Sequence, residues 1–264
     1  MTTPVAVVTG ASSGIGRALA RQLDAEGYAL VLCDVNEPGL RETQALLKRG
    51  SQRVTLDVSK RAEVEAMASD VIARHGRIDL VINNAGVSLY SSIAEVTIED
   101  FEWIFGINFW GVVYGTKAFL PKMLEQRSGT IVNLSSVFGM IAFPNQGTYN
   151  ASKFAVRGFT EALWLELEGT GVTPISVHPG GIKTNIARGT RVKGSGATKE
   201  QITTDFERAA TTTPEKAAEV ILRAVYDKKK RVMIGLDAQV IQLMARLLPE
   251  SYPSIVRAAL KKGG

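Results

Sequence analysis

Thr9-Gly10-Ala11-Ser12-Ser13-Gly14-Ile15-Gly16 is the stretch that decides the fold of this chain. It follows a short apolar run, Val5 to Val8, and leads into the alternating polar and apolar residues 17–26. This order predicts a strand, a glycine-rich turn and a helix. Glycines in such a turn let the chain bend sharply, let the backbone approach a bound group, and let the helix pack closely on the sheet. We assign these three roles to the three glycines in order.

The same turn is a candidate phosphate site. The N-terminus of the following helix presents free N–H groups and a partial positive charge, both of which suit a pyrophosphate. A glycine pattern alone is a weak signal, because an ordinary tight turn between strand and helix gives the same residues. Here the pattern opens a strand–helix–strand unit, and an acidic residue, Asp34, ends the next apolar run, Tyr28 to Cys33. The combination predicts a dinucleotide site.

The composition is that of a globular α/β protein. Of the 264 residues, 45% are hydrophobic, enough for the core of a single domain over 1–264. No apolar run reaches the ~18 residues of a membrane span. The first strand begins by residue 5, so we expect no signal peptide. The single cysteine, Cys33, excludes an internal disulfide and indicates a reducing, cytoplasmic setting.

Neither nucleic acid nor metal is an expected partner. The net charge is +5, and the densest basic run, Lys228 to Arg231, has no interleaved aromatic residues, so a solvated turn is its best interpretation. The two histidines, His75 and His178, lack metal-ligand spacing, and there is no Cys/His cluster. We expect both histidines to be structural.

Strand-like and helix-like segments alternate along the chain without a linker. Unbroken apolar runs, typical of sheets covered on both faces, predict strands at 5–9, 29–34, 53–58, 78–83, 130–135, 172–178 and 231–235. Helical patterns occupy roughly 14–26, 37–48, 60–74, 99–126, 149–168 and 214–227. Repeated right-handed βαβ units predict a Rossmann fold, a doubly wound parallel sheet of about seven strands flanked by helices.

Two segments break this rhythm. Residues 183–213 are rich in Gly, Thr, Lys and Arg and lack a clear strand. Because they follow the sixth strand at the carboxyl edge of the sheet, we predict a mobile substrate lid. Residues 236–264 carry apolar residues at helical spacing and predict a C-terminal helical extension. We expect it to pack on its own domain or on a partner subunit, and contact with a membrane surface is the alternative.

The residues that carry chemistry are concentrated between 130 and 184. Tyr149 and Lys153 are four apart at the start of a helix, which puts a phenol and an ammonium on one face. An ordinary aromatic and a surface lysine give the same pattern, but Ser135 and Ser136 end a strand at the same sheet edge. Asn108 interrupts an apolar helix, and buried without partners it would cost ~1–3 kcal/mol. A nearby ammonium and an oxidised nicotinamide would lower the tyrosine pKa from its usual ~10.

In this order the motifs resemble those of the short-chain dehydrogenase/reductase family in its single-domain form, over residues 4 to about 235. The glycine turn resembles the family's cofactor turn. Asn83-Asn84-Ala85-Gly86 resembles the motif that steadies the central sheet and lines the cofactor cleft. Pro179-Gly180 followed by Thr184 resembles the segment that holds the nicotinamide carboxamide. The family's catalytic tetrad matches Asn108, Ser136, Tyr149 and Lys153.

The resemblance implies a role for each residue of this tetrad. Tyr149 is the general base in alcohol oxidation and the general acid in ketone reduction. Lys153 binds the nicotinamide ribose and lowers the tyrosine pKa. Ser136, preferred over Ser135 because it lies thirteen residues before the tyrosine, donates to the substrate oxygen. Asn108 holds a water that relays protons toward Lys153.

The resemblance also implies the cofactor contacts. Asp57 and Val58, which close the third predicted strand, resemble the pair that contacts adenine, the first by its side chain and the second by its backbone. The full set of implied contacts is Gly10, Ser12, Ser13, Gly14, Ile15, Gly16, Asp34, Asp57, Val58, Asn84, Ala85, Gly86, Tyr149, Lys153, Pro179, Gly180, Ile182 and Thr184.

Asp34 decides between the two nicotinamide cofactors. Its carboxylate can accept hydrogen bonds from both adenosine ribose hydroxyls and would repel a 2′-phosphate. The family's NADP-preferring members carry a basic residue just before Gly14 or just after the second strand, and these places hold Ser13 and Val35. Arg17 is the one reservation, and we expect its side chain to be solvated. The sequence thus predicts NAD rather than NADP.

We therefore expect an NAD-dependent alcohol dehydrogenase or carbonyl reductase. The apolar residues within 137–143 favour a secondary alcohol or ketone on a hydrophobic frame, and Arg188 and Arg191 are the lid cations that could hold an anionic group. Two alternatives remain: an epimerase or dehydratase on the same scaffold, and a non-catalytic cofactor-sensing or scaffold protein. The family's helix pairing predicts a homodimer or homotetramer through 99–126 and 149–168.

Overall fold

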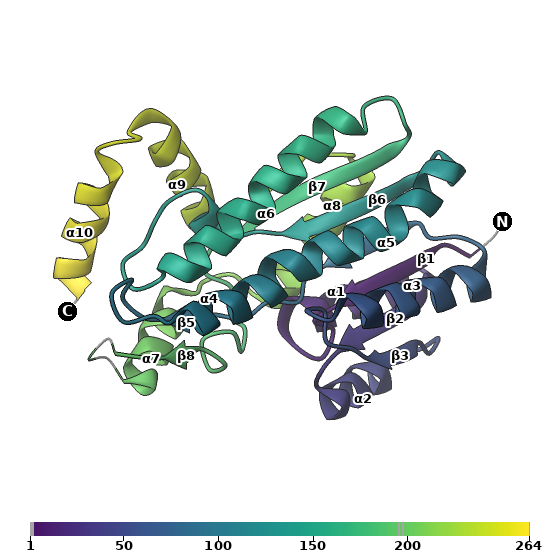
Figure 1. Cartoon of the computed structure of the whole chain (residues 1–264), viewed down its shortest axis with the longest axis horizontal. Helices are drawn as coiled ribbons and strands as arrows, with labels where there is room; N and C mark the ends of the chain where they lie inside the picture. Colours follow the sequence, from purple (N-terminus) through teal and green to yellow (C-terminus); the bar gives the residue numbers. More distant parts are fainter. Residues whose placement is uncertain (1–2, 195, 197, 264) are drawn as a thin grey trace.

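A parallel β-sheet forms the centre of the structure (Figure 1). The computed structural model describes residues 3–194, 196 and 198–263. The strands of the sheet are β1 (Val5–Thr9), β2 (Ala29–Asp34), β3 (Gln52–Thr55), β4 (Leu80–Asn83), β6 (Gly129–Leu134), β7 (Val172–Pro179) and β9 (Arg231–Ile234). They run in the order β3-β2-β1-β4-β6-β7-β9, and every neighbouring pair is parallel. This confirms the predicted doubly wound Rossmann fold of seven strands.

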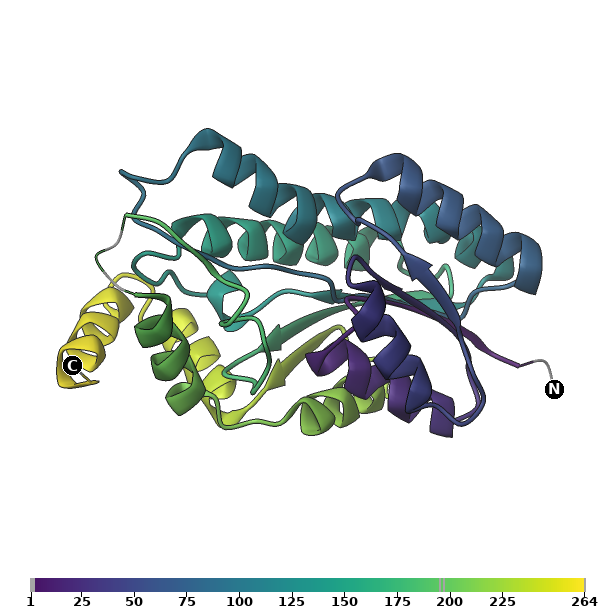
Figure 2. The ribbon, with the colours of Figure 1, turned by 90° about the horizontal axis from the view of Figure 1, so that it is seen from below.

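Helices cover both faces of this sheet (Figure 2). One face carries α3 (Arg61–His75), α5 (Gly111–Gln126) and α6 (Gly147–Glu166), and the other carries α1 (Gly14–Ala25), α2 (Glu37–Ala45) and α8 (Pro214–Tyr226). Successive side chains of a strand point to opposite faces of the sheet. Val5 and Val7 therefore join the core under α3, α5 and α6, while Ala6 and Val8 join the core under α1, α2 and α8. Burial on both faces is why the strands are continuous apolar runs.

The strand order reverses between β1 and β4. From β1 the chain builds outward through β2 and β3, then returns to place β4 on the other side of β1. Crossovers that leave in opposite directions open a crevice at the carboxyl ends of the two strands, where ligands of such sheets bind. The turn 10–16 follows β1 and therefore lies at this crevice.

The glycines and the side chain of Asn84 determine the shape of that turn. Gly10 and Gly14 have φ values of +66° and +51°, in the left-handed region that favours glycine. A Cβ atom on Gly16 would lie 2.1 Å from the Gly10 carbonyl oxygen, so Gly16 allows the turn to close on itself rather than the helix to approach the sheet. From β4, the Asn84 amide donates to the carbonyls of Thr9 at 2.9 Å and Gly10 at 3.2 Å.

Two predicted elements have different bounds. The helix expected at 99–126 consists of α4 (Ile98–Phe105), the π-helical turn η1 (Gly106–Trp110) and α5. A π turn holds one extra residue, and here it carries the buried Asn108. The strand expected at 53–58 ends at Thr55, because its partner β2 ends at Asp34.

The lid segment (183–213) was predicted to lack strands, and this prediction was wrong. It contains β8 (Arg191–Val192), which pairs in parallel with β5 (Leu89–Tyr90), and α7 (Lys199–Ala209), which begins with a capping box. A two-residue strand has too few residues to show a period in the sequence, and its partner lies about 100 residues away. Residues 195 and 197 of this segment lie outside the described residues.

The C-terminal extension forms α9 (Leu236–Leu247) and α10 (Tyr252–Gly263); residue 264 is not among the described residues. α9 packs against β9 and against the short 3-10 turn η2 (Val137–Gly139) through Ala238 and neighbouring residues. Its opposite side exposes a line of apolar side chains: Leu236, Val240, Leu243 and Leu247. Among the described helices, none combines the length and the hydropathy that crossing a membrane requires.

We predict that Gly16→Ala lowers the free energy of unfolding by about 1–3 kcal/mol, because the added methyl group would overlap the Gly10 carbonyl and force the turn open. Gly189→Ala is the matched control: its added Cβ would meet backbone oxygens at an ordinary 3.6–3.7 Å. The control should change stability by less than about 0.5 kcal/mol. Urea denaturation of the three proteins provides the test, and equal midpoints would contradict the closed turn.

Candidate active site

Three residues of the predicted tetrad meet at the carboxyl end of β6. Ser136 follows this strand and begins η2, where its hydroxyl accepts a hydrogen bond from the Phe138 N–H at 3.1 Å. Tyr149 and Lys153 lie on the first turns of α6, with the lysine Nζ 5.7 Å from the centre of the tyrosine ring. The Ser136 side chain lies close enough to the Tyr149 hydroxyl to lower the pKa of the tyrosine.

Lys153 is buried, with 4% of its surface exposed. Its Nζ donates to the main-chain carbonyl of Leu134 at 2.9 Å. The chain after β4 passes close to this ammonium at Gly86. A Cβ on Gly86 would lie 3.4 Å from Nζ and 3.2 Å from Oδ1 of Asn108. The motif 83–86 thus borders the predicted catalytic groups.

Asn108 is fully buried at the π turn, and its amide is paired inside the protein. Oδ1 accepts from the Val87 N–H at 2.8 Å, while Nδ2 donates to the Val87 carbonyl at 2.9 Å and to the Ser152 hydroxyl at 3.2 Å. The same hydroxyl donates to the Tyr149 carbonyl at 2.8 Å. Both amide hydrogens of Asn108 are used, so this residue can meet a water only as an acceptor.

Burial dominates the electrostatics of this group. Burial raises the pKa of Tyr149 to about 12, and the hydrogen bond with Ser136 lowers it only in part. Burial also lowers the pKa of Lys153 to about 8, because the charged ammonium loses its hydration. Within the protein itself the cost of desolvation outweighs the other influences on the tyrosine. The lowering of its pKa by the ammonium together with an oxidised nicotinamide stays a prediction.

At the end of β2, the Asp34 carboxylate lies beside the glycine turn. One oxygen accepts from the Ser12 N–H and the other from the Asn36 N–H, both at 3.0 Å. Each carboxylate oxygen retains a further lone pair, so both can still accept a hydroxyl donor. At the end of β3, Asp57 accepts from the N–H and the hydroxyl of Ser59 at 2.9 and 2.7 Å.

Arg17 is only partly solvated, whereas the sequence favoured a fully solvated side chain. Its guanidinium donates to the Ser12 carbonyl at 2.5 Å, to the Thr43 hydroxyl at 3.0 Å and to the Glu42 carboxylate at 2.8 Å. Gly39 makes this possible because α2 can then approach the turn: a Cβ there would lie 2.8 Å from the Ser12 Cβ. The positive charge of Arg17 is thus already paired.

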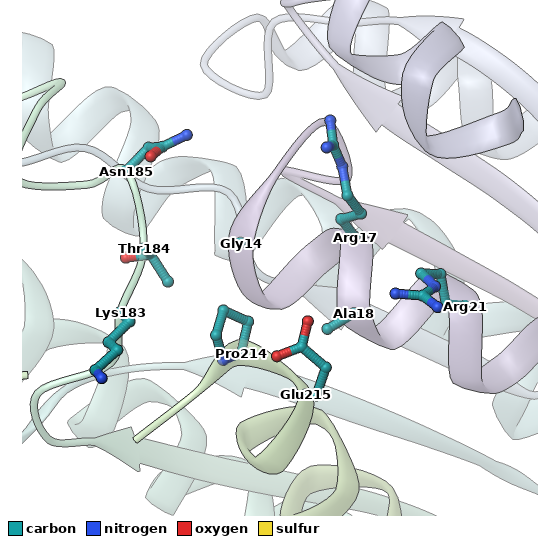
Figure 3. Close-up of a pocket in the computed structure, with 9 residues that line it drawn as sticks. All are labelled: Gly14, Arg17, Ala18, Arg21, Lys183, Thr184, Asn185, Pro214 and Glu215. Carbon is teal, nitrogen blue, oxygen red and sulfur yellow. The ribbon is translucent and has the colours of Figure 1, made fainter. Parts of the chain in front are cut away.

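A hollow of about 150 Å³ opens beside the glycine turn (Figure 3). Gly14 and Arg17 border it from α1, Pro214 and Glu215 border it from α8, and Thr184 reaches toward Gly14 from the start of the lid segment. A Cβ on Gly14 would lie 3.1 Å from the Thr184 Cγ2. Gly14 and Thr184 are thus close together at one edge of this hollow, beside the N-terminus of α1, which suits a phosphate group.

The turn after β7 is held by a residue that sequence reasoning missed. Asp237, in the first turn of α9, accepts from the Gly181 N–H at 2.7 Å. A Cβ on Gly180 would lie 2.1 Å from the same carboxylate oxygen. Ile182 is buried beyond this turn and bridges to Thr212. An acidic residue just after the last strand was the only signal that could have identified Asp237.

Charged residues anchor the lid segment to α4. The Arg191 guanidinium lies 3.5 Å from the centre of the Trp103 ring, and Lys193 Nζ lies 2.6 Å from the buried Asp100 carboxylate. The hydrogen bond from Lys193 lowers the pKa of Asp100. Arg188 pairs with Glu207 at 2.8 Å. The two lid arginines considered for binding an anionic substrate are therefore both engaged with the protein.

Comparison with known proteins agrees with this arrangement. A family model described as short chain dehydrogenase matches residues 4–193. The candidate oxidoreductase SadH of Mycobacterium tuberculosis (strain CDC 1551 / Oshkosh) is 44% identical over 264 residues, covering 98% of this chain and 95% of that protein.

Solved structures of short-chain dehydrogenases and of an alcohol dehydrogenase have a similar fold. A short chain dehydrogenase/reductase from Burkholderia phymatum in complex with NAD has a TM-score of 0.85 and 33% identity, covering 96% of this chain and 95% of that one. An alcohol dehydrogenase from the archaeon Thermococcus sibiricus complexed with 5-hydroxy-NADP has a TM-score of 0.74 and 28% identity, covering 88% and 96%.

The pKa of Lys153 predicts a pH dependence of stability. Between its folded value of about 8 and its ordinary value of 10.5, the unfolded chain binds a proton that the folded chain has released. Stability rises with pH in that window, and Tyr149 opposes this only above pH 10, where the unfolded chain loses its proton first. The stability advantage of the wild type over Lys153→Met should therefore grow between pH 8 and 10.

Urea denaturation of the ligand-free protein at pH 7.5, 8.5 and 9.5 measures this difference. The exposed Lys117 provides the control, and Lys117→Met should run parallel to the wild type across the series. A Lys153→Met curve that also runs parallel would mean that burial does not shift the pKa of this lysine.

Proposed function

Because this chain belongs to the short-chain dehydrogenase/reductase family of oxidoreductases, we propose that it transfers a hydride between a nicotinamide cofactor and a secondary alcohol or ketone. The observation that carries the proposal is the meeting of Ser136, Tyr149 and Lys153 at one strand end. Both members of the acid–base pair are present, which disfavours a non-catalytic cofactor-sensing or scaffold protein.

The residues present fit a dinucleotide. The N-terminus of α1, the tight glycine turn and Thr184 border a space that suits the pyrophosphate, and Asp34 keeps free lone pairs for ribose hydroxyls. In this proposal the nicotinamide half lies between Pro179-Gly180 and Lys153. When bound, the nicotinamide ring accepts or delivers the hydride.

The chain's own residues move the proton. The Tyr149 hydroxyl takes the proton of the alcohol in oxidation and returns it to the carbonyl oxygen in reduction. Ser136, which lowers the tyrosine pKa, donates to the substrate oxygen. Lys153 turns its ammonium from the Leu134 carbonyl toward the ribose and the phenol, where its charge stabilises the phenolate.

NAD is the cofactor that we propose. A 2′-phosphate would bring negative charge beside the Asp34 carboxylate, and the nearest guanidinium, Arg17, is already paired with Glu42. Relatives of this fold bind either cofactor, since the Burkholderia phymatum structure is in complex with NAD and the Thermococcus sibiricus structure with 5-hydroxy-NADP. In this chain the charges of Asp34 and of the paired Arg17 support NAD.

For the substrate we propose a hydrophobic frame. The segment after Ser136 is apolar, with Phe138 and Phe143 stacked at 5.2 Å and the Phe138 ring 6.2 Å from that of Tyr149. The Tyr252 hydroxyl of α10 accepts from the Ala142 N–H at 3.1 Å, so the C-terminal extension borders this segment. The two lid arginines are engaged elsewhere, which supports an uncharged substrate.

Tyr149→Phe should lower kcat by about 100-fold or more in both directions, because it removes the acid–base group and keeps the ring. NAD affinity should stay close to that of the wild type. The matched control is Tyr226→Phe, which removes a hydroxyl bonded to Glu26 far from the site and should leave kcat unchanged. Turnover of a panel of secondary alcohols and ketones, followed at the reduced nicotinamide band, tests this. Substantial turnover by the Tyr149→Phe variant would exclude Tyr149 as the acid–base group.

Asp34→Ala should reduce the preference for NAD over NADP by about tenfold or more, which corresponds to ~1.4 kcal/mol of lost discrimination. Asp57→Ala, at the end of the adjacent strand, should weaken both cofactors alike, because adenine is common to both. Calorimetric titration of each variant with NAD and NADP measures the two ratios. A wild type that binds NADP as tightly as NAD would overturn the assignment of Asp34.

We also propose that the protein is a cytoplasmic homo-oligomer, joined through α5 and α6. On α6 an exposed line contains only apolar or small residues, namely Phe154, Gly158, Ala162 and Leu165. Leu165 is 77% exposed, and Trp110 on the neighbouring helix is 45% exposed. A second copy of the same helix would cover these side chains without burying a charge. Cys33, which is a free and buried thiol, suits a reducing compartment.

Leu165→Glu should shift the oligomer toward a smaller species at micromolar concentration, because the interface would then bury an unpaired carboxylate. Leu46→Glu, at an equally apolar exposed position at the end of α2, is the control and should assemble like the wild type. Light scattering during gel filtration gives the masses. A wild type that is monomeric under these conditions would contradict the proposed helix pairing.

A further inference from the structure

His178 is a fully buried residue near the end of β7, one strand away from the catalytic group. Its Nδ1 lies 3.0 Å from the main-chain carbonyl oxygen of Ser136, and its Nε2 lies 2.8 Å from the hydroxyl of Ser176. Ser176 precedes it by two residues on the same strand, so the two side chains share one face of the sheet. The sequence alone suggested a structural histidine.

These partners determine which ring nitrogen carries the proton. A carbonyl oxygen can only accept, so Nδ1 must be the donor to Ser136. In the neutral ring Nε2 is then an acceptor, which the Ser176 hydroxyl satisfies by donating. Burial is the main cause that lowers the pKa of His178 to about 4; the nearby Arg231 also acts to lower it, while the hydrogen bond with the Ser136 carbonyl acts to raise it. The ring therefore stays neutral, with this tautomer, throughout the pH range of an enzyme assay.

Ser136 is thus held at two atoms. Its hydroxyl accepts from the Phe138 N–H, which fixes the start of η2, and its carbonyl accepts from His178, which fixes the peptide that leads into that turn. The second contact comes from a different strand and does not depend on the local turn. A shift of the carbonyl would rotate the same residue and move its hydroxyl relative to Tyr149.

We propose that His178 is a positioning residue, which holds the Ser136 carbonyl so that the serine hydroxyl is aligned with Tyr149 and the substrate oxygen. The inference rests on the proposed function, because the alignment matters only if Ser136 serves the reaction. His178 itself touches neither substrate nor cofactor in this role.

The charged groups around the ring are paired with one another. Glu161 of α6 accepts from Arg157 at 2.7 Å and also pairs with Arg231 of β9. Both arginines disfavour a charged imidazole and Glu161 favours one, with the arginines and burial prevailing. The ring nitrogens are thereby left to neutral hydrogen bonding, which is directional and suited to fixing a peptide.

Two amide variants separate the two hydrogen bonds. An asparagine amide occupies the place of Nδ1, so His178→Asn retains a donor for the Ser136 carbonyl. A glutamine amide reaches only the place of Nε2, so His178→Gln retains the contact with Ser176 and loses the other. Both side chains bury one neutral amide group, so each variant serves as the control for the other.

We expect His178→Asn to retain kcat within about threefold and His178→Gln to lose about 10- to 100-fold, in keeping with the cost of a misplaced catalytic group. KM for the alcohol should change less than kcat. The alkaline midpoint of the pH profile for oxidation should move upward in the glutamine variant only, because the aligned Ser136 hydroxyl lowers the pKa of Tyr149. Equal kcat values and equal midpoints for the two variants would overturn the proposal.

A readout without turnover separates this inference from the proposed function. Hydrogen exchange at the Phe138 amide, which is bonded to the Ser136 hydroxyl, should speed up in His178→Gln and not in His178→Asn. Ser136→Ala tests the function itself: full activity in that variant contradicts the role of the serine, whatever the exchange shows. Reduced activity in Ser136→Ala with identical exchange and kcat in both His178 variants contradicts only the positioning role.

Discussion

The closed glycine turn after β1 is the constraint on which the rest of the structure depends. The space for a Cβ atom on Gly16 is occupied by the Gly10 carbonyl, and the side-chain amide of Asn84 donates to the carbonyls of Thr9 and Gly10 at the start of the turn. This contact joins the end of β4 to the start of α1 across the point where the strand order reverses. The N-terminus of α1 is therefore aimed into the crevice, and Thr184 meets it from the far side.

Desolvation shapes the other half of the crevice. Lys153 is buried beside a neutral phenol, so its charge is costly in the ligand-free protein and its ammonium turns to a strand carbonyl. The same burial keeps Tyr149 protonated. A positive charge brought close to Tyr149 would lower its pKa. A positively charged nicotinamide ring, with ribose hydroxyls near Lys153, would therefore favour the phenolate that alcohol oxidation requires. In the proposed function, binding of the nicotinamide cofactor would therefore be coupled to the acid–base pair.

The segments that complete the site come from distant parts of the chain and are tied to one another. The lid segment joins β5 through β8 and joins α4 through Lys193 and Arg191. The C-terminal extension reaches back through Asp237 to the turn after β7, and through Tyr252 to the segment that follows Ser136. These segments are consequently held in place by specific contacts with one another and with the turns that follow the strands.

The sequence by itself determined the seven strands of the main sheet and the glycine turn, because apolar runs and φ-permissive glycines are local properties of the chain. The four-residue spacing of Tyr149 and Lys153 also predicted that they share a helix face, and the tetrad to which the resemblance assigns them stays a prediction. The sequence also indicated the helices of the C-terminal extension, through the spacing of residues such as Leu243. Only the tertiary structure decided the pairing of β8, the engagement of Arg17, the anchoring by Asp237 and the two hydrogen bonds of His178. It likewise decided the direction of the pKa shift of Tyr149. These contacts and this pKa shift depend on which residues from distant parts of the chain come close together and on how much water they exclude. Neither can be predicted from a local sequence pattern.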